Sequence, residues 1–155
     1  MLRCSFLSVV VVLASTVSAS AQESGQIVRI NTVHNVVRGG QTGMLIQIDT
    51  VAAGLKDRPV IIGAFFWTPA GVKLLARPGA FSTADGQVTA QGVETPMFVV
   101  TQIYNTELFV PYDELSLGIR GVHRQNFRIQ MQYFNGREWV RLAESAAVPY
   151  LVRQD

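Results

Sequence analysis

The sequence predicts an all-β protein, a two-sheet antiparallel sandwich of the immunoglobulin-like kind with seven to eight strands. Three observations lead to this prediction. Apolar and polar residues alternate with a period of two along most of the chain after residue 21. Turn-forming residues divide the chain into short segments of this kind. No long segment combines the apolar period of a helix with helix-capping residues.

The first 21 residues have the pattern of a secretory signal peptide. Arg3 precedes an apolar run over residues 6–17, and small residues follow up to Ala19-Ser20-Ala21, which fits a cleavage site. The run is short for a stable membrane span, so an uncleaved anchor is the less favoured alternative. We expect a signal peptide over residues 1–21, a single domain over residues 22–155, a periplasmic or secreted location and no membrane span after cleavage.

Composition excludes several classes of function for the exported chain. The only cysteine, Cys4, would leave with the signal peptide, which removes disulfides and thiol chemistry. The full chain has 13 Lys and Arg against 11 Asp and Glu, a net charge of +2. Nucleic-acid binding needs a clustered basic face. The arginines here are scattered, and Arg120, Arg124 and Arg128 fit one solvated side of a strand. We therefore expect no nucleic-acid partner.

The first half of the domain predicts a series of strands in order. A strand over residues 26–37 turns at 38–43 and pairs with an antiparallel strand over 44–54. Residues 58–69 are apolar on both faces, which predicts a central strand. The further predictions are a turn at 68–71, a short return strand at 72–76, a short strand at 87–90 and one long or two bent strands over 97–112.

Residues 127–142 predict a β-hairpin. The segment FRIQMQYF places Phe127 and three further apolar residues on one face, with Arg128 and two glutamines on the other. Asn135-Gly136 follows, the strongest two-residue hairpin signal, because both positions tolerate positive φ. The returning segment REWVRLA places Trp139 on its polar side. We expect paired strands over 127–135 and 136–142.

The segment FVPYDELSLGIRGVH, residues 109–123, predicts a structural corner. Pro111 cannot donate to a strand ladder and marks a strand end, and Gly121 lets the chain bend into the next strand. In immunoglobulin-like folds a tyrosine bonds to the backbone of such a corner, and here Tyr112 or His123 could do so. We expect His123 to be largely buried at the start of the penultimate strand, bonded to the corner.

The same segment allows a catalytic alternative, a hydrolase that uses Asp113 or Glu114 with His123. Adjacent carboxylates on an extended chain point to opposite faces, whereas a glycosidase pair faces across the substrate at about 5–10 Å. No G-x-S-x-G motif surrounds a serine, and Asp57 and Asp85 lie in no calcium-loop pattern. His34 and His123 have no ligand-spaced partner. We therefore predict no catalytic residue, no metal and no cofactor.

Aromatic residues suggest a carbohydrate-binding alternative. Trp139, with Tyr112 or Tyr104, could form a stacking surface, and Trp139 is the best candidate for an exposed aromatic because it alternates with Arg137 and Arg141. Trp67 lies in the most apolar segment and is expected in the core.

Short motifs along the domain resemble a family of small β-sandwich modules of bacterial secreted proteins, which occur alone or attached to other domains such as caspase-like peptidases. The motifs are Val33-His34-Asn35, Gly43-Met44, Ala64-Phe65-Phe66, Phe109-Val110-Pro111-Tyr112, Glu114-Leu115 and Gly121-Val122-His123. The resemblance implies an accessory or recognition role and brings no catalytic residues.

The resulting prediction is an exported, non-enzymatic module that binds a protein or a cell-envelope component such as a glycan. The carbohydrate-binding module and the hydrolase remain as alternatives.

Overall fold

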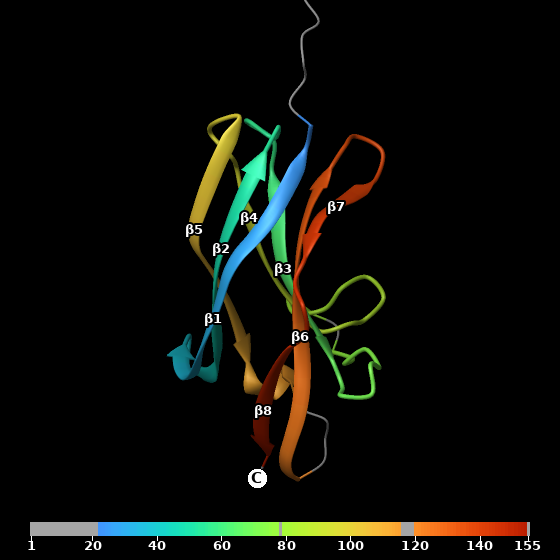
Figure 1. Cartoon of the computed structure of the whole chain (residues 1–155). Coiled ribbons are helices and arrows are strands. Elements are labelled where there is room, and N and C mark those ends of the chain that lie inside the picture. Colours follow the sequence, from blue (N-terminus) through green and yellow to red (C-terminus); the bar gives the residue numbers. More distant parts are fainter. Residues whose placement is uncertain (1–21, 78, 116–119, 155) are drawn as a thin grey trace, which may run out of the picture.

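The computed structural model describes residues 22–77, 79–115 and 120–154. These residues form two antiparallel sheets packed face to face, which confirms the predicted sandwich (Figure 1). The predicted signal peptide and residues 116–119 of the corner lie outside the described residues. The elements are β1 (Ser24–Arg38), β2 (Gln41–Ala53), β3 (Val60–Trp67), β4 (Thr89–Glu94), β5 (Val100–Pro111), the 3₁₀ helix η1 (Tyr112–Leu115), β6 (Gly121–Phe134), β7 (Trp139–Glu144) and β8 (Val148–Gln154).

One sheet has three strands in the order β1-β2-β5, and the other has five. In the larger sheet, β3 lies between β4 and β6, and the long strand β6 has two partners on its other edge. β7 pairs with Gln130–Phe134 of β6, and β8 pairs with Gly121–Phe127. The chain changes sheet after β2, after β4 and after β5, which gives the immunoglobulin-like connectivity.

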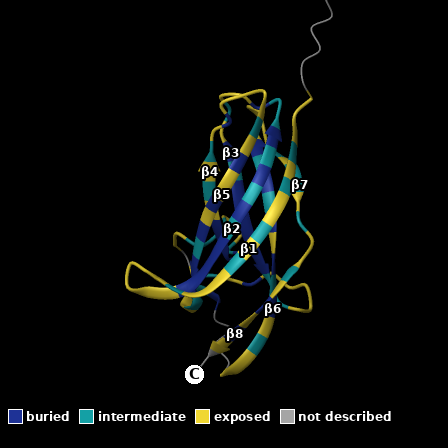
Figure 2. Ribbon diagram, turned by 60° about the vertical axis from the view of Figure 1, so that its left-hand side comes forward, coloured by how far each residue is buried: buried dark blue, intermediate teal, exposed yellow. Residues whose placement is uncertain are grey.

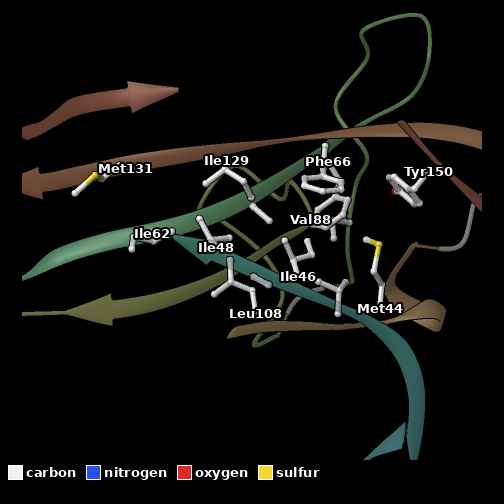
Figure 3. Close-up of a cluster of buried hydrophobic side chains, with 14 of the residues drawn as sticks. Met44, Ile46, Ile48, Ile62, Phe66, Val88, Leu108, Ile129, Met131 and Tyr150 are labelled. Carbon is white, nitrogen blue, oxygen red and sulfur yellow. The ribbon is translucent and has the colours of Figure 1, made fainter. Parts of the chain in front are cut away.

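The core lies between the sheets and follows the period of two. Met44, Ile46 and Ile48 of β2 point inward, and β2 is correspondingly the most buried strand of its sheet (Figure 2). Ile62 and Phe66 of β3 and Ile129 and Met131 of β6 face them (Figure 3). Each such side chain contributes about 1.5–3 kcal/mol to folding by leaving water.

Most of the predicted strands are confirmed. β1 pairs with β2, β3 is central in its sheet, and β6 and β7 form the hairpin. The hairpin turn is longer than predicted, because Phe134 pairs with Trp139 and leaves four residues between them. The Asn135 side-chain oxygen accepts hydrogen bonds from the backbone N–H groups of Arg137 and Glu138, at 2.8 and 3.0 Å. This Asx turn closes the wider loop.

Three strand predictions differ from the structure in position or extent, and one strand was not predicted. The return strand at 72–76 forms only isolated bridges, because the Leu74 backbone bonds both to Phe66 and to Val88. The strand predicted at 87–90 is β4, which begins at Thr89. The C-terminal strand β8 was not predicted, and residues 97–99 lie outside β5.

The strand pairing shows which loops lie at each end of the sandwich. Ser24 pairs with Ala53, Ala53 with Val100, and Val60 with both Glu94 and Tyr133. The start of β1 therefore lies at the same end as the loops 54–59, 95–99 and 135–138. We call this the N-terminal end, and the opposite end, where β8 finishes, the C-terminal end (Figure 1). Among the described residues no helix is long and apolar enough to cross a membrane.

Candidate functional site

The predicted corner lies at the C-terminal end. Pro111 is the last residue of β5 and is buried, η1 follows it, and Gly121 begins β6 with a φ of 117°. His123 lies on the inner face of β6, as predicted, and pairs with Val152. It is half-buried rather than largely buried, because β6 extends past β3 here: the β3 pairing begins only at Asn126. Two strands follow β6, so β6 is not the penultimate strand.

Gln125 makes the buried polar link between the corner and β6. Its side-chain N–H donates to the Leu115 carbonyl of η1 at 3.0 Å, and its side-chain oxygen accepts from the Tyr150 hydroxyl of β8. Gln125 is fully buried and Tyr150 nearly so. Burial raises the pKa of the Tyr150 hydroxyl above its ordinary value, which keeps it a donor. The sequence signal was a glutamine on the inner side of a strand, and the prediction overlooked it.

Tyr112 bonds to a backbone group of β1, outside the corner. Its hydroxyl accepts the Asn35 N–H at 3.0 Å and lies 3.1 Å from His34 Nδ1, with the two rings stacked. Asn35 has a φ of 59° and sits in an irregularity of the β1 pairing between Val33 and Val36. Tyr112 therefore holds a bulge of the edge strand β1 against η1.

Two open hollows lie between β1 and the strand pair β7–β8. One, of about 520 Å³, is lined by His34, Asn35, Tyr112 and residues 151–153 of β8. The other, of about 500 Å³, lies between residues 25–30 of β1 and residues 143–146. Each hollow coincides with an irregularity of β1, since the pairing also shifts between Ile27 and Arg29. Most of their lining residues are uncharged.

The carboxylates of the catalytic alternative lie in η1 and not in an extended strand. Asp113 is exposed and Glu114 half-buried. The prediction that Asp113 and Glu114 point to opposite faces of a strand therefore does not apply. The hydrolase stays an alternative. Within residues 22–77, 79–115 and 120–154, no group of three His, Cys, Asp or Glu side chains could hold a metal ion.

The outer face of the three-stranded sheet carries a network of paired polar groups. Asp49 accepts the Asn105 backbone N–H at 2.9 Å and the Arg29 guanidinium at 2.8 Å. The hydrogen bond from the Asn105 backbone is the larger cause, and the bond from Arg29 the smaller one, of a pKa for Asp49 that is below its ordinary value. Glu107 likewise accepts from Arg38 and from Gln47. These carboxylates connect neighbouring strands, so we assign this face a structural role.

The predicted ligand-binding aromatics are not brought together. Trp139 is exposed, as predicted, and packs on Phe134 with ring centroids 5.5 Å apart. Tyr104 is exposed on β5 of the other sheet. Tyr112 lies at the level of His123 in β6, and Trp139 lies beside Phe134 in the same strand. At the rise of a strand, Tyr112 and Trp139 are therefore roughly 35 Å apart along β6.

The prediction that Trp67 belongs to the core was wrong. The core residues of β3 alternate with Trp67, which is half-buried on the outer face of the larger sheet. The Arg128 guanidinium lies over its ring, 5.7 Å from the centroid.

In the part of the chain that the structure describes, the longest run of exposed apolar side chains lies at the N-terminal end. Met97, Phe98, Val99 and Val100 follow one another in the chain, and their exposed fractions lie between 53% and 69%. Phe134 and Trp139 are exposed at the same end. We call these six residues the apolar end. Figure 2 shows the loop that joins β4 to β5 as exposed.

Backbone hydrogen bonds hold this loop in place. The Val99 carbonyl accepts the Gly54 N–H, and the Pro96 carbonyl accepts the Asp57 N–H, both at 2.8 Å. The Thr101 hydroxyl accepts the Phe98 N–H and donates to the Phe98 carbonyl, each at 3.0 Å. The loop is thus attached to its neighbour through its backbone, while its apolar side chains face solvent.

Charges around the apolar end are balanced. Glu23 accepts hydrogen bonds from the Tyr133 hydroxyl and from Arg58, and these bonds, in that order, lower the pKa of Glu23. Lys56 lies 4.0 Å from Asp57. The hairpin loop adds the adjacent pair Arg137 and Glu138.

No family model, no curated protein and no solved structure matches this chain.

Proposed function

We propose that this chain is an exported, non-catalytic binding module and that the apolar end is its binding surface. The observation that carries the proposal is the run of four consecutive apolar side chains, each more than half exposed, at the end of a loop held by backbone hydrogen bonds and at the first residue of β5. Single exposed apolar residues are common on soluble proteins, whereas contiguous apolar patches mark interaction sites.

Binding would bury these side chains and gain the free energy of removing them from water. Complete burial of an apolar side chain of this size contributes about 1.5–3 kcal/mol. The exposed parts of four such side chains would give about 4–7 kcal/mol before the entropic cost of association. The expected export places the partner in the periplasm or outside the cell. An accessory role also agrees with the resemblance to β-sandwich modules of secreted proteins.

Site-specific crosslinking in cells tests the proposal. A photoreactive side chain replaces Met97 in the full-length, exported chain and, as a control, replaces Val122. Val122 is similarly exposed but lies near the C-terminal end, at the start of β6. We expect adducts from position 97 that are absent at position 122 and that disappear with the second substitution Phe98→Ser. Equal labelling at both positions, or no adduct with protein or with lipid at either, would contradict the proposal.

A specific observation also favours a second candidate, a carbohydrate-binding surface on the outer face of the larger sheet. The exposed Trp139 shares this face with Gln130, Gln132 and Arg141. An aromatic ring beside amide and guanidinium groups is suited to stacking on a sugar and bonding its hydroxyls. A glycan array with the wild-type chain and with Trp139→Ala tests it; binding unaffected by the substitution would argue against this face.

A further inference from the structure

We propose that the partner of the apolar end is a lipid bilayer, into whose surface the loop side chains insert. This inference rests on the proposed function and specifies its partner. Its first support is the arrangement of the loop. Consecutive side chains of a non-helical chain diverge, so a flat protein surface would cover only some of Met97, Phe98, Val99 and Val100. Lipid chains can surround all four at once, and all four are exposed.

The rest of the N-terminal end also fits an interfacial position. Phe134 and Trp139 flank the hairpin turn 135–138 at the same end, and tryptophan is enriched at membrane–water interfaces. Lys56 and Arg58 each lie beside a carboxylate, Asp57 and Glu23. The balanced charges imply attachment by apolar burial, without a preference for anionic lipids.

The position of the chain start gives an independent argument for a membrane. The expected signal peptide joins the domain next to Glu23, whose carboxylate bonds to Arg58 in the loop 54–59. The same loop supplies the N–H groups of Gly54 and Asp57 that hold the apolar loop. The apolar end is therefore the end that adjoins the exporting membrane when the domain emerges.

Flotation with lipid vesicles tests the inference. The exported chain is mixed with vesicles of phosphatidylcholine, or of phosphatidylcholine with phosphatidylglycerol, at low and at high salt. We expect comparable binding to both vesicles, with little dependence on salt because exposed charges contribute little. Met97→Ser with Phe98→Ser should weaken binding at least about tenfold, since two apolar side chains are lost. The matched control Val122→Ser should bind like wild type, with unchanged unfolding midpoints for both variants.

Tryptophan fluorescence gives a second measurement. The chain has two tryptophans, and Trp67 lies toward the C-terminal end. In a Trp67→Phe variant, emission from Trp139 should shift to shorter wavelength on vesicle addition and be quenched by brominated lipid. No shift and no quenching in vesicle-bound protein would overturn this orientation.

The outcomes separate this inference from the proposed function. Flotation lost in the double serine variant and kept in Val122→Ser would support the lipid inference. No flotation, together with crosslinking of position 97 to a protein, would overturn the lipid partner and leave the proposed function standing. Dimerisation that depends on Phe98 would overturn it in favour of a second copy. Neither flotation nor crosslinking would overturn both.

Discussion

Replacement of the buried glutamine of β6, Gln125→Leu, should destabilise the fold strongly. Leucine nearly preserves the volume but removes both the bond to the Leu115 carbonyl and the bond from the Tyr150 hydroxyl. Each buried group left without a partner costs about 1–3 kcal/mol. The more apolar side chain returns roughly 1 kcal/mol through burial. The net loss in the free energy of unfolding is then about 1–5 kcal/mol.

Urea unfolding at neutral pH measures this loss, with Gln132→Leu as the matched control. Gln132 lies on the same strand but on its outer face, where it bonds only to the neighbouring Gln130 side chain. The control should change stability by less than about 0.5 kcal/mol. A double-mutant cycle with Tyr150→Phe should show coupling of about 1 kcal/mol. Equal stability of Gln125→Leu and wild type would refute the assigned link between the corner and β6.

The other predictions concern neighbouring polar groups and one glycine. Because burial raises the pKa of Tyr150, its contribution to stability is complete below the unfolded tyrosine pKa of about 10 and is lost as pH rises above it. Urea midpoints at alkaline pH should therefore fall more steeply in wild type than in Tyr150→Phe, and parallel curves would contradict this. Tyr112→Phe should cost about 0.5–1.5 kcal/mol and speed hydrogen exchange of the Asn35 amide, whereas unchanged exchange would argue against that bond. Gly43→Ala should cost at least about 2 kcal/mol in urea unfolding, because its Cβ would lie 2.2 Å from the Val110 backbone oxygen; a neutral substitution would contradict the close approach.

Period-two alternation was sufficient to predict the strands whose one face is buried. It predicted the β6–β7 hairpin and placed His123 and Phe127 on the same inner face. It could not give the depth of burial, which depends on how far neighbouring strands extend. β3 stops short of His123, whereas Gln125 is enclosed by η1 and β8. The buried link from η1 to Gln125 was therefore not predicted, although Gln125 lies on the same face as His123.

The apolar end was missed for a related reason. Residues 97–100 are apolar and partly β-branched, and such a run is typical of a buried strand. The loop conformation depends instead on hydrogen bonds from Gly54 and Asp57, more than 35 residues away in the chain. Tyr112 bonds to Asn35 across 77 residues. Non-local contacts of this kind have no periodic signature in the sequence.

Three edge strands, β1, β5 and β8, have features that disfavour pairing with another chain. β1 is irregular at two places, and β5 carries Asn105 with positive φ where its pairing with β2 shifts. β8 contains Pro149, which cannot donate to a further strand. Bulges and prolines at edges disfavour edge-to-edge addition of another chain. Copies of this domain are therefore discouraged from pairing through these three strands, while Phe98 and its neighbours stay exposed at the N-terminal end.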